Sequence, residues 1–347
     1  MFIQRIRILA LFTVIFLLTS VLAGCTGDKQ EKNFKVGVLH FGNIGDYGWT
    51  YEAHLAAQRA AEELPYVDLS EREEACGPDA PEIMKAHIKE GSKILFCHSW
   101  DFGKYIEEVA PNYPDVIFMW GGGDRKIAQN TGIYFGRMYE GRYLSGMVAG
   151  AMTKTNKIGY AAAIPIPEVI RGIDAFARGV DSVNPEAKIY VEWINEWYAP
   201  IHEKEVTESL IDKGCDIITN HSDSYAPAEA AEKRGVYFIS YHSDLRAFAP
   251  DVFLTGVVWN WALVMTDIIE AVHDGSWSEY PDQDWWYGLA DGGVKLAPYS
   301  DLVPDEVINT VDERKQMIIS GNFQIFPEMN DNELREISYF EPNRIIF

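Results

Sequence analysis

Aromatic and polar side chains gather in short loops that follow predicted strands. Trp49 lies in one such loop, just after Asp46 and Tyr47, and Trp197 lies in another loop far along the chain. Indole rings stack on flat aromatic ligands, while carboxylates and amides bond to the edge N–H groups and ring nitrogens of such ligands. Because Trp49 and Trp197 come from different halves of the chain, we expect them to hold a flat ligand between them. A single tryptophan is more often a core residue, and the chain has ten, so the prediction depends on the polar neighbours.

Further polar residues follow other predicted strands, and we expect the same ligand to contact them. The predicted acceptors for edge N–H groups are Asp46, Asp101 and Asp244. The predicted polar rim consists of Asn220, Ser222, Asp223 and His242. Tyr47 is also predicted to contact the ligand, and three residues are expected to shape the pocket near a hinge, namely Trp100, Trp259 and Asn260.

Catalytic, phosphate-binding and metal-binding patterns are weaker in this sequence. Gly42, Gly45 and Gly48 follow a strand, but their GxxGxxG spacing differs from the GxGxxG dinucleotide fingerprint. No G-x-S-x-G nucleophile motif is present. Strand-end histidines at positions 98, 221 and 242 lack acidic partners at helical spacing, and no CxxC pair occurs. We therefore predict no cofactor and no metal, and enzyme activity is the minority interpretation.

The elements that position these loops alternate between strands and helices. Apolar strand-like runs occur at 36–40, 93–98, 116–120, 157–163, 188–194, 215–220 and 237–241. Helical patterns are found at 51–64, 103–110, 139–152, 261–273 and 304–320. This alternation is typical of βαβ units with parallel sheets, whose strands are apolar on both faces and whose ligands bind beyond the carboxyl ends of the strands. Two such units are predicted, at about 34–136 and 137–256, and the remaining segment returns to complete them.

The N-terminus has the layout of a lipoprotein signal. Arg5 and Arg7 precede an apolar run at 8–22, and small residues lead to Cys25. The run is short for a transmembrane helix, which needs about 20 apolar residues. We predict a signal peptide at 1–24, a lipid on Cys25, and a flexible tether at 25–34. The alternative is an N-terminal membrane anchor with an incidental cysteine.

Composition limits the class of partner. The chain is 47% hydrophobic and 24% charged, with a formal net charge of −22. Nucleic acid is an improbable partner, because phosphate backbones need basic patches. Apart from Cys25, three cysteines remain, which allows one intramolecular disulfide at most. Cys97 and Cys215 lie in apolar runs and are predicted to be buried thiols.

Several motifs together resemble one known family. They are Gly45-Asp-Tyr-Gly-Trp-Thr50, Arg137-Met-Tyr-Glu-Gly-Arg-Tyr143, Ile164-Pro-Ile-Pro-Glu-Val-Ile-Arg-Gly172, Asn260-Trp261 and Gly292-Gly-Val-Lys-Leu-Ala-Pro298. In this order, over about 35–320, they are similar to the basic membrane protein family, which comprises solute-binding lipoproteins or periplasmic components of ABC importers. The resemblance implies an α/β type I periplasmic-binding-protein fold, with two doubly wound parallel-sheet lobes joined by three crossovers. We assign 35–136 plus 258–290 to the N-terminal lobe and 137–257 plus 291–347 to the C-terminal lobe.

The same resemblance suggests the ligand and the partners. Relatives in this family include purine-nucleoside receptors, and by position Trp49 and Trp197 match their two stacking rings. Lys104 stands where those receptors carry an Asp that reads the base, and His242 and Trp259 stand where they bind ribose. We therefore expect a purine-type nucleobase, or a nucleoside, captured outside the cytoplasm and delivered to an ABC permease in the membrane. The alternatives are a ligand sensor for a membrane receptor and a nucleoside-processing enzyme.

Overall fold

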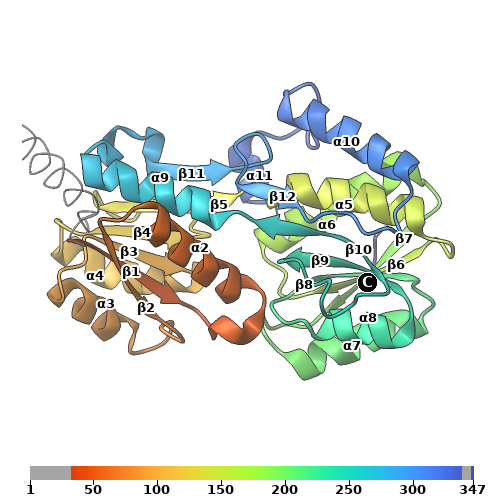
Figure 1. Ribbon diagram of the computed structural model, residues 1–347, viewed down its shortest axis with the longest axis horizontal. Coiled ribbons are helices and arrows are strands. Elements are labelled where there is room, and N and C mark those ends of the chain that lie inside the picture. Colours follow the sequence, from red (N-terminus) through yellow and green to blue (C-terminus); the bar gives the residue numbers. More distant parts are fainter. Residues whose placement is uncertain (1–32, 338–344) are drawn as a thin grey trace, which may run out of the picture.

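The computed structural model describes residues 33–337 and 345–347. The predictions for the signal peptide, for the lipid on Cys25 and for most of the tether lie outside the described residues. The described chain forms two α/β lobes that lie side by side (Figure 1). None of the helices in these ranges is long and apolar enough to cross a membrane.

The sheet of the N-terminal lobe has six strands, and every pairing in it is parallel. Its order across the sheet is β11 (Asp284–Tyr287), β5 (Thr131–Gly136), β4 (Ile117–Gly121), β3 (Ile94–His98), β1 (Phe34–His40) and β2 (Val67–Arg72). One strand, β11, therefore comes from far along the chain and joins the edge beside β5.

The sheet of the C-terminal lobe has seven strands, and only the edge pairing of β10 with β12 is antiparallel. Its order is β12 (Val294–Leu296), β10 (Phe253–Trp259), β9 (Tyr237–His242), β8 (Ile217–His221), β6 (Lys157–Ala162), β7 (Lys188–Trp193) and β13 (Ile345–Ile346).

Both faces of each sheet are covered by helices, which explains the continuous apolar strands. In β1, Val36 and Val38 pack on the side of α2 (Trp49–Glu63) and α9 (Trp261–Asp274). Leu39 points to the other face, where α3 (Ala80–Lys89) and α4 (Gly103–Val109) lie. Successive side chains of a strand alternate between faces, so a strand with two covered faces needs apolar residues throughout.

The C-terminal lobe repeats this arrangement. On one face, Ile158 and Ile217 pack with α5 (Met138–Met152) and α6 (Pro167–Val183). On the other face, Ile218 packs with α7 (Pro200–Asp212) and α8 (Ala226–Arg234). In Figure 1, α7 and α8 lie below the sheet of this lobe, and α5 and α6 lie above it.

The chain passes between the lobes three times: from β5 to α5, from β10 to α9, and from β11 to β12. Two parallel-sheet lobes joined by three crossovers were predicted, and this arrangement is confirmed.

The remaining elements are short or lie near the end of the chain. Helix α10 (Asp305–Ile319) packs on α5, and α11 (Asp331–Arg335) packs on α6. The helical pattern predicted from Pro304 begins one residue later, because Pro304 is the extended N-cap residue of α10. The 3₁₀ helices are η1 (Ile44–Asp46), η2 (Trp100–Phe102), η3 (Ala110–Asn112), η4 (Trp277–Glu279) and η5 (Pro281–Gln283).

The three described cysteines are free thiols. Cys97 and Cys215 are buried, as predicted, and Cys76 is partly buried. Burial raises the pKa of all three thiols, which makes them poor nucleophiles.

Candidate functional site

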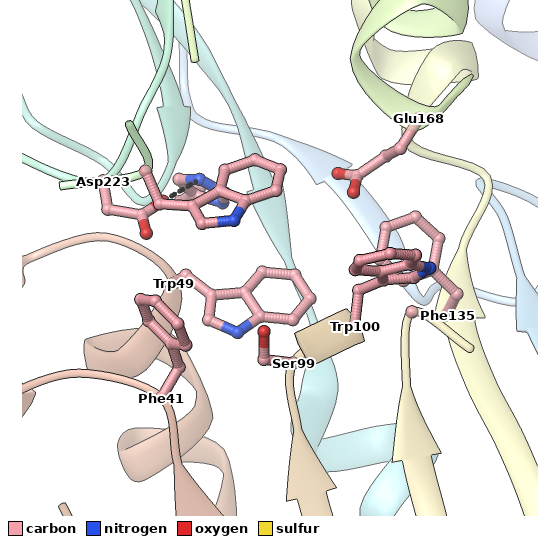
Figure 2. Close-up of a pocket in the computed structure, with 10 residues that line it drawn as sticks. Phe41, Trp49, Ser99, Trp100, Phe135, Glu168 and Asp223 are labelled. Carbon is pink, nitrogen blue, oxygen red and sulfur yellow. Dashed lines mark ion pairs between the residues drawn. The ribbon is translucent and has the colours of Figure 1, made fainter. Parts of the chain in front are cut away.

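A cavity lies between the two lobes, beyond the carboxyl ends of strands from both sheets (Figure 2). About 390 Å³ of space lies between its walls, part of it open to solvent. Half of its lining residues are phenylalanines or tryptophans, and the full lining consists of Phe41, Trp49, Ser99, Trp100, Gly122, Phe135, Glu168, Trp197, Asp223 and His242. Open α/β sheets bind ligands in this position, because the loops that leave the strands converge there. Five residues predicted from the sequence belong to the lining: Trp49, Trp100, Trp197, Asp223 and His242.

Trp49 is the first residue of α2 and is held from several sides. Its indole N–H donates a hydrogen bond to the carbonyl of His98 at 2.9 Å. Its ring stacks on the His98 imidazole at 4.2 Å between centroids, and the ring of Trp261 meets it edge-on at 5.4 Å. With one face on His98, Trp49 can offer only its other face to a ligand. The ring is preorganised, so little side-chain entropy is lost on binding.

Trp197 reaches the same cavity from the other lobe. It lies in the loop between β7 and α7, where Asn195 adopts a left-handed backbone conformation with φ of 62°. The carbonyl of Trp197 accepts a hydrogen bond from the N–H of Asp223 at 2.9 Å. This bond joins two loops of the C-terminal lobe and fixes both lining residues relative to each other.

Trp100 forms a more exposed part of the lining. It begins η2, and 48% of its surface is exposed. In Figure 2 it lies with Phe135 on the side of the cavity away from Phe41. An exposed indole at a cavity edge is available to cover an incoming ligand.

Asp223 and His242 form a buried polar pair in the cavity wall. Asp223 Oδ1 lies 2.9 Å from His242 Nε2. The contact is short but poorly aligned, and Nε2 makes no good hydrogen bond. The indole N–H of Trp259 donates to His242 Nδ1 at 2.8 Å, so the proton of a neutral imidazole resides on Nε2. His242 therefore keeps a donor that a ligand can use.

Electrostatics favour the neutral forms of this pair. Burial, followed by the neighbouring His221 and Arg142, holds the pKa of His242 well below its usual range. Burial, followed by the carboxylates of Asp46 and Glu203, raises the pKa of Asp223 well above its usual range. Removing both groups from water costs more than their mutual attraction returns.

Glu168 is a second acidic residue in the lining and was not among the predicted site residues. It lies in the first turn of α6, and in Figure 2 its carboxyl group is directed into the cavity. Tyr241 donates its hydroxyl to Glu168 Oε1 at 3.4 Å, and His221 Nε2 lies 3.3 Å from the same oxygen. Burial raises the pKa of Glu168 to about 7, against the opposing effect of Arg171. At neutral pH this carboxyl group can donate or accept a hydrogen bond.

Asp46 does not line the cavity. Its carboxylate instead supports the start of α2. Its carboxylate accepts hydrogen bonds from the backbone N–H groups of Gly48, Thr50 and Tyr51 at 2.8 to 2.9 Å. These are the free N–H groups at the start of α2, which need acceptors. Both oxygens are used, so Asp46 supports Trp49 instead of meeting a ligand directly.

Other predicted polar residues also lie outside the lining. Asp101 accepts from the Ser99 hydroxyl at 3.0 Å, and Asp244 accepts from the Arg246 N–H at 3.1 Å. The Asn220 amide donates to the carbonyl of Ser222 at 3.0 Å, within the loop that carries Asp223. These bonds lie within single loops and shape the segments that present the lining, although the buried Oδ1 of Asn220 accepts no hydrogen bond from the described residues.

Ser222 and Ser224 are fixed by a buried carboxylate. Both hydroxyls donate to Glu203 Oε2 at 2.7 Å, and Glu203 is fully buried. Glu203 also accepts the backbone N–H of Ala199 at 2.9 Å. The carboxylate thus ties the loop that follows Trp197 to the loop that contains Asp223.

Tyr47 joins the lobes at the edge of the cavity. Its ring meets Tyr225 at 5.6 Å and Phe248 at 5.0 Å, both edge-on. Ser243 donates its hydroxyl to the Tyr47 carbonyl. Next to it, Gly48 approaches Asp223 so closely that an added Cβ would lie 2.2 Å from the Asp223 carbonyl oxygen. These contacts connect the loop before α2 to the C-terminal lobe, so the structure represents a closed form.

The two remaining predicted residues lie at a crossover between the lobes. Trp259 ends β10, is 4% exposed, and stacks on Trp261 at 4.3 Å. Asn260 lies between β10 and α9, and its amide donates to the carbonyl of Gly292 at 2.9 Å. That bond links the crossover from β10 to α9 to the crossover from β11 to β12.

Five lining residues were missed by the sequence analysis: Phe41, Ser99, Gly122, Phe135 and Glu168. Phe41, Ser99 and Gly122 lie in strand-end loops, so their location carried a signal although their residue types did not, and Glu168 lies in the first turn of α6. Phe135 lies inside β5, a strand of which the sequence analysis gave no prediction.

A larger pocket, with about 1280 Å³ of space that is partly open to solvent, adjoins the first one and shares part of its wall, including Trp100, Phe135 and Glu168. Its other walls carry Arg171, Trp286 and Arg335. The aromatic cavity therefore opens toward a wider and more polar space between the lobes.

The histidines considered earlier as metal ligands are engaged in other contacts. His98 Nδ1 bonds to the Tyr134 hydroxyl at 2.7 Å, and His221 contacts Glu168. Among residues 33–337 and 345–347, the group of histidine and acidic side chains arranged to hold a metal is His40, His54 and Glu71, outside this cavity.

Known proteins resemble this chain over most of its length. A purine-binding protein of Brucella abortus is 37% identical over 315 residues, covering 90% of this chain and 88% of the relative. A putative ABC transporter glucose-binding protein of Haloferax volcanii is 31% identical over 300 residues, covering 86% of this chain and 76% of the relative.

Solved structures confirm the fold. An ABC transporter solute-binding protein from Aeropyrum pernix superimposes with a TM-score of 0.73 at 21% identity, covering 87% of this chain and 98% of that one. A transcriptional activator of the comK gene from Bacillus halodurans gives 0.73 at 24% identity, covering 83% and 99%. Both support the type I periplasmic-binding fold. Residues 33–328 match the family described as ABC transporter substrate-binding protein, PnrA-like, and the chain belongs to that family.

Proposed function

We propose that this substrate-binding protein captures a purine-type nucleobase between its two lobes, for import by an ABC permease. The observation that carries the proposal is the aromatic cavity, to which the N-terminal lobe contributes Trp49 and the C-terminal lobe contributes Trp197. A flat heteroaromatic ring stacked on either indole would draw the two lobes together. Stacking of a base on an aromatic side chain is worth about 1–3 kcal/mol.

The balance of lining groups favours a purine over a sugar. A sugar presents hydroxyl groups around its ring, and each buried group without a partner costs about 1–3 kcal/mol. The polar side chains of the lining are Ser99, Glu168, Asp223 and His242, against five aromatic ones. The sequence identities to known proteins also favour a purine. The relative named as purine-binding is 37% identical to this chain, and the one named as glucose-binding is 31% identical.

The polar groups suit the edge of a purine, which carries both ring-nitrogen acceptors and N–H donors. The Nε2–H of His242 contacts Asp223 Oδ1 at 2.9 Å without forming a well-aligned hydrogen bond, and it can donate to a ring nitrogen of the ligand instead. Asp223 and Glu168 have raised pKa values because they are buried. Each can donate while protonated and accept once a ligand N–H favours its ionised form.

A free base fits this cavity better than a nucleoside does. His242 and Trp259 stand where nucleoside receptors of this type are expected to bind ribose. Here the two side chains bond to each other, and Trp259 is almost fully buried. Their bulk occupies space that a ribose would need, and neither offers the Asp and Lys pair that holds a sugar.

Capture works by closure of the lobes, without a chemical step. The contacts of Tyr47 and Gly48 with the C-terminal lobe exist only in a closed form, so ligand stacking and lobe docking reinforce each other. We further propose that a lipid on Cys25 keeps the protein at the outer side of the membrane, near the permease. Substrate-binding proteins of ABC importers act outside the cytoplasm, which is consistent with such an anchor.

The ligand class can be tested on purified protein. Mass spectrometry of molecules released on denaturation, followed by a thermal-shift panel, should identify a purine base, because a ligand that binds only the folded state raises the melting temperature. Nucleosides should act more weakly and glucose should have no effect. If glucose shifts the melting temperature and no purine does, the proposed ligand is wrong. Genes for a permease and an ATPase beside this gene would support import over sensing.

A further inference from the structure

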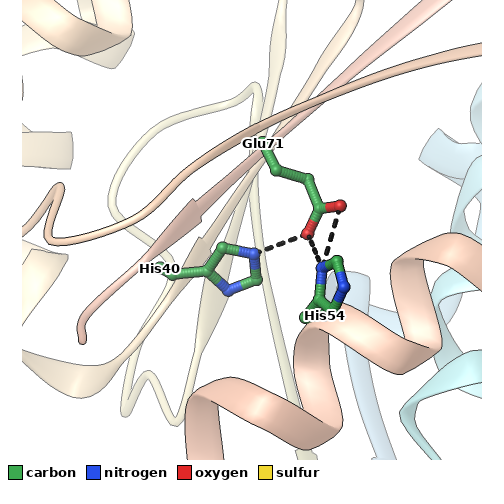
Figure 3. Close-up of side chains that lie close together, drawn as sticks. All are labelled: His40, His54 and Glu71. Carbon is green, nitrogen blue, oxygen red and sulfur yellow. Dashed lines mark hydrogen bonds and ion pairs between the residues drawn. The ribbon is translucent and has the colours of Figure 1, made fainter. Parts of the chain in front are cut away.

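Three side chains meet outside the lining of the ligand cavity. His40 ends β1, His54 lies in α2, and Glu71 lies in β2 (Figure 3). Glu71 Oε2 is 2.7 Å from His40 Nε2 and 3.0 Å from His54 Nδ1. All three potential ligand atoms lie within 4.8 Å of one another. Three separate elements thus direct metal-binding atoms to one point.

The spacing suits a tetrahedral metal ion. Zinc binds imidazole nitrogen and carboxylate oxygen at about 2.0–2.2 Å, which places neighbouring ligand atoms about 3.4 Å apart. The two observed contacts are slightly shorter, as expected of hydrogen bonds that a metal would replace. Small side-chain rotations would admit the ion, and two histidines with one carboxylate are a ligand set that zinc uses.

The surroundings favour a cation and give it access. An open pocket of about 780 Å³ adjoins the cluster and is lined by His54, Glu71, Glu73 and Glu74, with Arg72 as the opposing charge.

Part of the second layer of support that metal sites use is present, although the buried Nδ1 of His40 has no hydrogen-bond partner among the described residues. His40 is fully buried, so its ring orientation is fixed by packing. The amide of Gln58 donates to Glu71 Oε1 and holds the carboxylate in place. Such outer contacts orient ligands and raise metal affinity.

We propose that His40 Nε2, His54 Nδ1 and the Glu71 carboxylate bind a divalent transition metal ion of the zinc type, with a fourth coordination position open to the adjoining pocket. The ion would fasten β1, β2 and α2 together at the base of the segment between Phe41 and Trp49. Both of those residues line the ligand cavity. The metal therefore stabilises the part of the ligand site that the N-terminal lobe contributes. This role does not depend on which ligand the cavity binds.

The test uses the untagged chain, stripped of metal with a chelator. Equilibrium dialysis against Zn²⁺ with elemental analysis should find one equivalent per chain. Co²⁺ should give the visible absorption of a tetrahedral complex. His54→Ala and Glu71→Gln should weaken Zn²⁺ binding by more than about 100-fold, since loss of even an outer-shell contact costs 10- to 100-fold. His54 is partly exposed, and alanine is a good helix former, so this variant should fold.

Two control variants test whether Zn²⁺ binding depends on coordination by the cluster, rather than on the local negative charge or on the number of histidines. Glu74→Gln removes a negative charge from the same pocket, and His202→Ala removes a histidine from another helix. Both should bind Zn²⁺ like the parent protein. The proposal is overturned if the parent takes up no stoichiometric Zn²⁺, or if His54→Ala, folded by circular dichroism, binds as tightly as the parent. In either case the cluster is a hydrogen-bonded group only.

Discussion

The close approach of Gly48 to Asp223 allows a specific test of lobe closure. The two residues belong to different lobes, and a Cβ on Gly48 would lie 2.2 Å from the Asp223 carbonyl oxygen and 2.8 Å from its carbonyl carbon. Ordinary contacts between such atoms are about 3.5 Å. In a Gly48→Ala variant the two loops must therefore separate by more than about 1 Å, or the closed form must be abandoned.

The size of the effect follows from the cost of overpacking, which is about 1–3 kcal/mol. This cost falls on the closed form alone, because the clash disappears when the lobes separate. Since about 1.4 kcal/mol corresponds to a tenfold change, the affinity for the ligand should fall about 5- to 150-fold. The free energy of unfolding of the ligand-free, open protein should change by no more than about 0.5 kcal/mol.

Titration calorimetry of a purine base and urea denaturation without ligand measure these two quantities. Gly77→Ala is the matched control, because a Cβ there meets nothing within 4 Å. Parental affinity in Gly48→Ala would refute the closure argument. So would a loss of ligand-free stability as large as the loss of binding energy, because the substitution would then act within one lobe.

Four further predictions follow from the site and the N-terminus. Trp197→Ala should weaken binding of a purine base about 5- to 150-fold in calorimetry, through loss of one stacking ring, while Tyr198→Ala in the same loop should bind normally. Glu168 has its folded-state pKa raised from 4.5 to about 7, so its ionisation destabilises the fold progressively as pH rises from 4.5 to 7. Glu168→Gln should then be more stable than the parent at pH 8, by about 1–3 kcal/mol in urea denaturation, and the difference should vanish toward pH 4.5. Asp46→Ala should lower the free energy of unfolding by about 1–2 kcal/mol, because three N–H groups of α2 lose their acceptor. Cys25→Ser should move the protein from the membrane fraction to the soluble fraction while purine binding persists, and a variant that stays in the membrane would contradict the lipid anchor.

Much of the fold could be predicted, because strands and helices are indicated by patterns within short stretches of the sequence. Apolar runs such as the one that became β3 stand between helical patterns, and their order indicates a parallel sheet. The place of the ligand cavity followed from this order, because strand-end loops meet at one edge of a parallel sheet. Several strands were not predicted, β10 to β13 among them. Two others have weak patterns: β5 contains two glycines, and β2 has polar residues at four of its six positions.

The roles of individual polar residues depended on contacts that spacing does not reveal. Asp46 looks the same in the sequence whether it binds a ligand or caps a helix, and only the fold shows three N–H groups directed at it. His40 and Glu71 meet because β1 pairs with β2, a strand that the sequence did not indicate. The His40, His54 and Glu71 cluster could therefore not be predicted from the sequence without the pairing of β1 with β2.

The central claim is capture of a purine base between the two tryptophans, and a crystal structure with a bound base tests it most directly. We predict a planar ring stacked between Trp49 and Trp197, with polar contacts to His242 and to Asp223 or Glu168. A base bound instead in the wider neighbouring space beside Trp286, or a structure in which only a sugar occupies the aromatic cavity, would contradict the account.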